Sequence, residues 1–315
     1  MKASPAPKEP ITPLILTPRH EQILQAIHEY RYATAQDITN LLFSKGSLTY
    51  VRHLMSALAD GKDQQARHYL YRFPFPTGSA GNRERIFTLG ALGRNFLANE
   101  LGMPVDWYFR PYKSNRLSHS HVLHHVLLTR FMIATKTYTR EHPNVSLLES
   151  RLCHELARSE SMRVGKKGKP AIPVIIPDAL LLFALRSNAA DPNGAHYPVI
   201  LEIDRGSEFR TKFKRHLKAR LDFIRSGEYK KMFDHPAVIV AYVASGARPE
   251  HMQRRVKTMA AWAQAVLTEL DLPGWGVIFR FTAISLDTLY EDIPSLLEAP
   301  VWYRPDKTEP VPLFS

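Results

Sequence analysis

The sequence lacks the features that mark secreted, membrane-spanning and zinc-binding proteins. Its single cysteine, Cys153, has no partner for an intramolecular disulfide and excludes a cysteine-rich zinc site. No apolar run reaches the roughly 18 residues that a membrane-spanning helix needs. The first residues, MKASPAPKEPITP, contain no apolar segment of the kind found in signal peptides. We therefore expect a protein of the reducing cytoplasm that does not insert into a membrane.

Motifs that would indicate several common enzyme chemistries are missing too. The chain contains neither the GxGxxG pattern nor the Walker A pattern, so nucleotide binding has no support. It also lacks the GxSxG pattern that surrounds the nucleophile of many serine hydrolases. The function must therefore be sought in the charge of the chain and in the spacing of its polar residues.

Positive charge is what the chain has in excess. It carries 42 Lys and Arg against 30 Asp and Glu, a formal net charge of +12. This excess attracts polyanions, of which nucleic acid and anionic membranes are the usual candidates. The most basic segment, 207–233, spreads its cations around a helix rather than on one face, which disfavours a membrane-surface role. The charge therefore indicates DNA as the partner.

With 315 residues, of which 44% are hydrophobic, the chain is long enough for two domains. Proline and lysine at the start indicate a flexible tail, and Gly, Pro, Trp and basic residues after position 101 indicate a linker. The predicted segments are a tail at 1–16, a first domain at 17–101, a linker at 102–116, a second domain at 117–300 and a loose tail at 301–315.

The first domain has the element order of a winged helix-turn-helix. Helical patterns at 17–32, 35–43 and 47–61 precede two strand-like segments at 67–75 and 83–90, and a further helix fits 91–101. The third helix of such a module enters the major groove of DNA. Four of its residues lie opposite its apolar stripe and are predicted to contact DNA: Thr49, Tyr50, Arg52 and His53.

Arginines in or beside the two strands of the predicted wing could neutralise DNA phosphates. They are Arg67, Arg72, Arg83 and Arg85. The alternative is that these arginines form a solvated hairpin face. Winged helices also serve as protein-interaction or dimerisation modules, so a homodimer is a further possibility.

The second domain alternates strands with helices, which predicts an α/β fold with a mixed sheet and an α+β chain overall. Helices are predicted at 119–142, 207–233 and 249–270. Strands are predicted at 145–153, at 172–185 with a turn at Pro177-Asp178, and at 197–204, 237–245 and 276–284.

Three acidic residues are predicted to meet at one edge of this sheet. Glu202 and Asp204 are two residues apart on a strand and so share a face, and Asp178 precedes a neighbouring strand. Clustered carboxylates repel one another unless a cation binds, which predicts an Mg²⁺ or Mn²⁺ site. Such a metal could activate water for phosphodiester cleavage. The alternative is a structural salt-bridge cluster with the neighbouring basic helix.

At these residues the chain resembles the PD-(D/E)xK nucleases, through Pro177-Asp178 and Glu202-Ile203-Asp204. From about Leu16 to Leu267 it resembles the replication-relaxation family of bacterial mobile elements, through the segment LEIDRGSEFRTKFKRHL. That family is akin to the MobC-type relaxases. The resemblance implies a winged helix joined to a restriction-endonuclease-like domain, DNA nicking or processing at an origin, and a protein associated with the nucleoid or a plasmid.

The chain departs from the nuclease motif at one position, because Asp204 stands where the motif has lysine. A lysine from the following helix could substitute, and Lys212 is the preferred candidate. Three further cations of that helix could hold the DNA backbone: Lys214, Arg215 and Lys218. Glu149 and Glu155 are weaker candidates for an additional acid.

His121 is a candidate metal ligand, since His121 and His125 are four residues apart on one helical face. The alternative is a group of polar histidines at the start of a helix. Two functions therefore remain open: a metal-dependent endonuclease or nickase, and a non-catalytic DNA-binding regulator or accessory factor. Other mobilisation or replication proteins are possible partners of both.

Overall fold

The computed structural model describes residues 14–63, 67–75, 84–109, 119–157, 176–186, 194–206, 209–227, 229–230, 235, 237–246 and 248–315. The chain divides into two compact units, Met1–Thr129 and Arg130–Ser315, and the division falls within helix α5 (His119–Glu141). The units are called the N-terminal and C-terminal unit below. Among the described residues, no helix is both long and apolar enough to cross a membrane.

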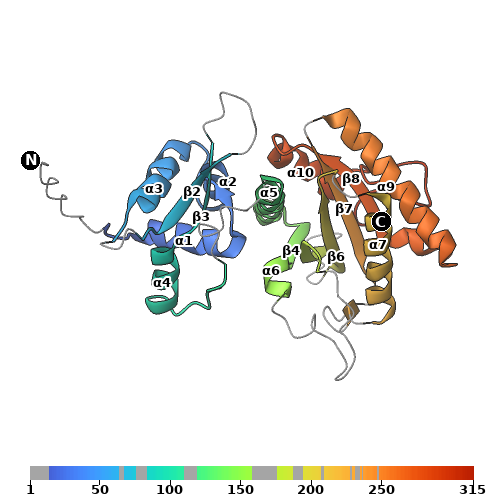
Figure 1. Ribbon diagram of the computed structural model, residues 1–315. Coiled ribbons are helices and arrows are strands. Elements are labelled where there is room, and N and C mark those ends of the chain that lie inside the picture. Colours follow the sequence, from blue (N-terminus) through green and yellow to red (C-terminus); the bar gives the residue numbers. More distant parts are fainter. Residues whose placement is uncertain are drawn as a thin grey trace, which may run out of the picture. The chain divides into compact units, whose positions relative to one another are not determined.

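The N-terminal unit contains the helices and strands that the sequence predicts, in the predicted order (Figure 1). Its elements are α1 (Pro18–Tyr30), β1 (Ala33–Thr34), α2 (Ala35–Leu42), α3 (Leu48–Asp60), β2 (Leu70–Pro74), β3 (Arg85–Leu89) and α4 (Ala91–Asn99). The short strand β1 was not predicted. It pairs with β3, which gives an antiparallel sheet in the order β1-β3-β2.

The local sequence determines where helix α1 begins and which of its faces is buried. The hydroxyl of Thr17 accepts from the backbone N–H of His20, and Pro18 occupies the first turn, where its missing N–H is not needed. Ile23, Leu24 and Ile27 recur at helical spacing and are completely buried. The apolar stripe of α1 therefore forms part of the core of the unit.

The C-terminal unit is built on a mixed sheet of five strands, which confirms the predicted α/β class. Its elements after α5 are β4 (Val145–Leu152), α6 (Cys153–Leu156), β5 (Ala179–Leu185), β6 (Ala195–Asp204), α7 (Arg210–Arg225), β7 (Ile239–Ser245), α9 (Pro249–Glu269), η3 (Trp275–Ile278), β8 (Phe279–Ile284) and α10 (Leu289–Glu298). The strand order is β4-β5-β6-β7-β8. Strands β4, β5 and β6 pair antiparallel, whereas β6, β7 and β8 pair parallel.

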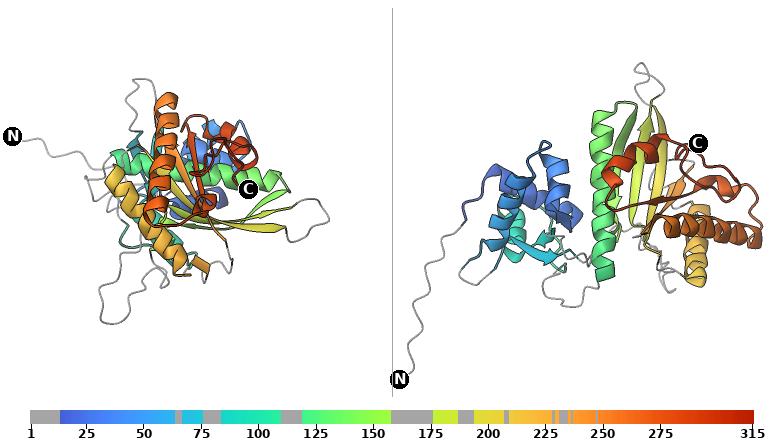
Figure 2. Two further views of the ribbon diagram at one scale, coloured as in Figure 1. Left: turned by 90° about the vertical axis from the view of Figure 1, so that its right-hand side faces the viewer. Right: turned by 90° about the horizontal axis from the view of Figure 1, so that it is seen from above.

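Helices cover both faces of this sheet, with α7 and α9 on one face and α10 with the second half of α5 on the other (Figure 2). Every residue of β7 is buried, as expected for a central strand of a two-sided sheet. The core beneath α7 and α9 joins Phe213 and Leu217 of α7 to Val256 of α9 and to apolar residues of β6, β7 and β8. Residues that alternate along β6 therefore face either this core or the opposite helix layer.

The end of the chain corrects one prediction, because residues 301–315 are packed rather than a loose tail. Trp302 is completely buried, and its backbone pairs with that of Val311. The guanidinium of buried Arg280 donates to the carbonyl oxygens of Pro312, at 3.2 Å, and Leu313, at 3.1 Å. These carbonyls accept the hydrogen bonds that the buried guanidinium needs, and the contact holds the segment in place. The composition of the segment does not reveal this long-range contact.

Candidate functional site

The outward face of α3 is polar and exposed, as predicted. Thr49, Tyr50, Arg52 and His53 are all exposed. The opposite face is apolar, and Val51, Met55 and Leu58 are completely buried. Helical periodicity therefore separates a face that anchors α3 in the core from a face that is available to a partner. The ring of Tyr50 packs edge-on against that of Phe43, and this contact restrains the Tyr50 side chain.

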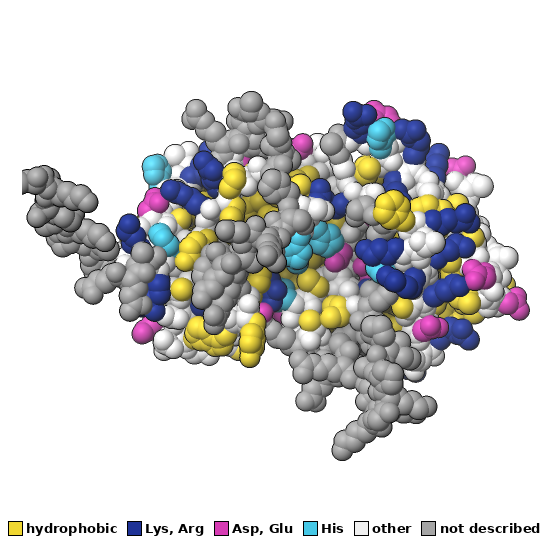
Figure 3. Space-filling view, in the orientation of Figure 1, with side chains coloured by type: hydrophobic (Ala, Val, Ile, Leu, Met, Phe, Trp, Pro, Cys, Tyr) yellow, Lys and Arg dark blue, Asp and Glu magenta, His cyan; other side chains and the backbone are white. Residues whose placement is uncertain are grey.

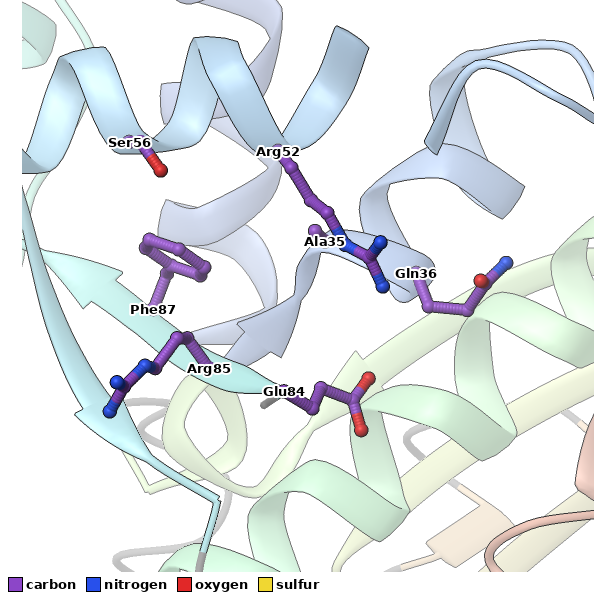
Figure 4. A pocket seen from close by; sticks show the side chains of 7 residues that line it. All are labelled: Ala35, Gln36, Arg52, Ser56, Glu84, Arg85 and Phe87. Atoms are coloured by element: carbon purple, nitrogen blue, oxygen red, sulfur yellow. The ribbon is translucent and has the colours of Figure 1, made fainter. Parts of the chain in front are cut away.

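A shallow hollow lies beside this face, where α3 approaches α2 and β3 (Figure 4). Arg52 of α3 reaches toward Gln36 of α2, whereas Arg85 extends from β3 on the other side of the hollow. Glu84 and Phe87 complete much of its lining. Two arginines from separate elements thus flank one concave surface, an arrangement suited to the phosphates that border a DNA groove.

Two other arginines predicted for the wing have acidic partners. Arg67 donates to Asp63 at 2.7 Å, and Arg72 lies 3.1 Å from Asp60. These pairs link the arginines to the end of α3 and the residues just after it, so they brace this part of the unit. Arg83 lies outside the described residues. Of the four predicted phosphate contacts, Arg85 is the one that is described as exposed and forms no ion pair within the described chain.

In the C-terminal unit, Asp178 stands at the start of β5, next to β6. One of its carboxylate oxygens, Oδ2, accepts from the backbone N–H of Ile203 at 2.7 Å. The neighbouring register pairs Ala179 with Leu201, so the strands do bring Asp178 close to the acidic end of β6. The contact shown for this carboxylate is a backbone hydrogen bond that fixes one strand to the next.

Glu202 forms an ion pair with Arg220 of α7, and the Arg220 side chain is only 2% exposed. Ile200, Glu202 and Asp204 alternate onto the face of β6 that α7 and α9 cover, as predicted for residues two apart. A nearly buried arginine needs an acidic partner, because an isolated charge in a low-dielectric interior is costly. Glu202 therefore neutralises the charge of Arg220 beneath the helix layer.

Asp204 is bound by the guanidinium of Arg255 from α9. The Nε–Oδ2 distance is 2.7 Å and the Nη2–Oδ1 distance is 3.3 Å, so both carboxylate oxygens are engaged. The same guanidinium lies 5.0 Å from the ring centroid of Trp262, which adds a cation–π contact. Asp204 thus stands where the nuclease motif has a lysine, and it meets an arginine from another element.

The acids of β6 are arranged as ion pairs, not as a carboxylate cluster. In the part of the chain that the structure describes, no group of three or more His, Cys, Asp or Glu side chains is placed to hold a metal ion. The weaker acid candidates also have other roles. Glu149 pairs with Arg151 at 2.5 Å, and Glu155 accepts from the backbone N–H of Leu152 at 2.7 Å.

The histidines of α5 belong to the N-terminal unit. The rings of His121 and His125 are 4.4 Å apart between centroids, and the ring of His125 also lies beside that of Tyr32. Desolvation of the ring lowers the pKa of His121, and the charges of His124 and Arg31 lower it further. The side chain of His121 is exposed, and its ring contact is with His125.

The predicted DNA-binding cations of α7 separate into two kinds. Glu269, at the end of α9, lies 2.6 Å from the Nζ atom of Lys218 and 3.7 Å from that of Lys214. The hydrogen bond from Lys218, with the charge of both lysines, lowers the pKa of Glu269. Arg215 and Lys212 are exposed. Two of the cations predicted to bind DNA therefore also join α7 to α9.

The Glu202–Arg220 pair agrees with the alternative of salt bridges to the neighbouring basic helix, but neither Arg220 nor Arg255 was predicted as the partner of these acids. Arg220 follows Phe213 and Leu217 at helical spacing, a signal that it lies on the buried side of α7. The sequence contains no comparable signal for Arg255, because its partner is 51 residues away.

Comparison with known proteins gives one match. The family model described as Replication-relaxation matches residues 24–235, more than half of the 315 residues. The match includes the exposed face of α3, Asp178, the acids of β6, and α7. No curated protein and no solved structure matches the chain.

Proposed function

This chain belongs to the replication-relaxation family, and from that premise we propose that it binds DNA during replication or mobilisation of a bacterial mobile element. The proposal assigns DNA recognition to the N-terminal unit, acting as a winged helix-turn-helix. The observation that carries it is the exposed polar face of α3 beside the two arginines of the hollow. The net charge of +12 supports the same partner.

In this proposal the residues of α3 have different roles. Arg52 and His53 face outward on the part of the helix that a winged helix presents to base edges, and Thr49 and Tyr50 stand one turn earlier. Arg85, from β3, contacts the phosphate backbone on the other side of the hollow. The base contacts give sequence preference, whereas the phosphate contact positions the module.

We further propose that the C-terminal unit does not cut DNA. Catalysis by a carboxylate cluster requires oxygen atoms that are available to a metal ion. Arg255 occupies both carboxylate oxygens of Asp204, and Arg220 neutralises Glu202. The protein then acts as a DNA-binding regulator or accessory factor, which can dimerise or dock other mobilisation or replication proteins.

One observation favours a second candidate, the metal-dependent endonuclease or nickase. Asp178 does lie beside the acidic end of β6, held there by Ile203. If the two arginines release the acids, Asp178, Glu202 and Asp204 would hold Mg²⁺ or Mn²⁺. The metal would supply an activated water, and Lys212 would stand in for the motif lysine.

The DNA-binding proposal is tested by fluorescence anisotropy with duplexes taken from the DNA around the gene. We expect one duplex to bind more tightly than duplexes of arbitrary sequence, and Arg52→Ala to weaken that preferred binding about tenfold, the loss of one good base contact. Arg140→Ala, an exposed arginine of α5, serves as the control and should bind as the wild type does. Equal affinity of the wild type and Arg52→Ala for every duplex would refute the proposal.

A further inference from the structure

Exposed cations gather on the outer surface of α7 and α9, the helices that cover one face of the C-terminal sheet. Figure 3 shows Lys and Arg side chains grouped over these two helices, with fewer Asp and Glu side chains among them. We call the group the α7–α9 basic surface and define it by Arg210 and Arg215 of α7 and Arg254 and Lys257 of α9, all exposed.

These four cations are not used to hold the fold together. Within the described residues, none of them forms an ion pair. Four other basic residues of the two helices differ in this respect: Arg220 and Arg255 bind the acids of β6, and Lys214 and Lys218 bind Glu269. The inward-facing and interhelical cations therefore form ion pairs within the protein. The four cations of the α7–α9 basic surface can bind a partner.

Unpaired like charges repel one another. A polyanion that binds to such a surface relieves this repulsion, so its binding is favourable. A nucleic-acid backbone matches such a surface better than a single small anion, because it presents charges at regular spacing along its length. The helices α7 and α9 pack against each other through Phe213 and Trp262, which fixes the two helices that carry these cations relative to one another.

We propose that the α7–α9 basic surface is a second DNA-binding surface, which holds the phosphate backbone of a duplex without reading its bases. The inference rests on the proposed function and extends it. Recognition of a site by the N-terminal unit would bring the C-terminal unit into contact with the flanking duplex, at a high effective concentration. The C-terminal unit would then bind DNA through its outer helices.

The test measures how DNA binding by the full-length protein depends on salt, with a labelled duplex of arbitrary sequence. Each phosphate contact contributes about 0.9 to the slope of log K against log salt concentration. The double variant Arg215→Gln/Arg254→Gln removes one cation from each helix and should reduce the slope by about 1.8. The control, Arg140→Gln/Lys307→Gln, makes the same charge change at exposed positions outside the surface and should keep the wild-type slope.

Both double variants change exposed side chains, so their thermal unfolding midpoints should equal that of the wild type. An unchanged slope in Arg215→Gln/Arg254→Gln would overturn the inference, and so would an equal decrease in the control, which would show that net charge alone matters. Arg52→Gln, measured on the preferred duplex, reports separately on the N-terminal unit. If the inference alone fails, Arg52→Gln still weakens preferred binding; if the proposed function fails, it does not.

Discussion

At the scale of single residues, the fate of Glu202 separates the two functions that the sequence leaves open. A carboxylate in a metal site is repelled by its neighbours when the metal is absent, so that its removal stabilises the protein. A carboxylate that neutralises a buried arginine has the opposite effect, because its removal leaves a charge without compensation. The contact with Arg220 places Glu202 in the second group.

We therefore expect Glu202→Gln to lower the free energy of unfolding by about 3 kcal/mol, the cost of breaking a buried ion pair from one side. Urea unfolding followed by circular dichroism measures this change. Replacing both partners, as in Glu202→Leu/Arg220→Met, should recover most of the loss, since neither charge remains. An increase in stability of Glu202→Gln without added metal would instead indicate clustered carboxylates.

At the scale of elements, the contact between α5 and α10 shows how a titratable group joins two helices. Tyr138 of α5 is buried, and its hydroxyl donates to Glu298 of α10 at 2.5 Å. Its ring stacks on that of His142, with 3.8 Å between the centroids. Burial, the hydrogen bond to Glu298 and the charge of Glu298 together raise the pKa of Tyr138 to about 12.

This contact predicts a specific alkaline sensitivity. A pKa that is higher in the folded state than the ordinary value of 10 means that the neutral phenol is favoured by folding. The stability that it contributes is fully present below pH 10 and is lost as the pH rises through about 12. We expect the wild type to lose more unfolding free energy than Tyr138→Phe over this range. Parallel loss in the two proteins would contradict the assignment.

The packed C-terminal segment carries another lesson at this scale. Composition suggests a loose tail for residues 301–315, because prolines and charged residues are frequent there. The buried guanidinium of Arg280 reverses that expectation, since its donors require acceptors that the segment supplies. A single internal polar group can therefore order a segment whose own sequence has little tendency to form structure.

At the scale of the whole molecule, the proposal joins a DNA-reading unit to a unit whose acidic residues are neutralised. It predicts that purified protein will leave supercoiled plasmid intact in Mg²⁺ or Mn²⁺, even when the plasmid carries DNA from around the gene. Agarose gel electrophoresis detects open circles directly. Metal-dependent open circles that disappear in both Asp178→Ala and Glu202→Ala would establish the nuclease and refute the non-catalytic function.

Much of the architecture followed from the sequence alone. Periodic apolar residues predicted α1, α2 and α3, and runs of β-branched residues predicted β7, because burial of one face or of both faces leaves a regular trace along the chain. The polar face of α3 was predicted for the same reason. The family was also recognised from the sequence, through the segment that includes Glu202 and Asp204.

Only the tertiary structure decided which charges meet. Glu202 and Asp204 have the spacing of a metal site, yet their partners come from α7 and α9, and Glu269 captures two lysines that were predicted to bind DNA. Spacing along one strand fixes the direction in which a side chain points, because the backbone alternates. The charge that it encounters depends on how α7 and α9 fold over the sheet. Periodicity marks Arg220 as inward-facing, but it does not say which acid Arg220 meets.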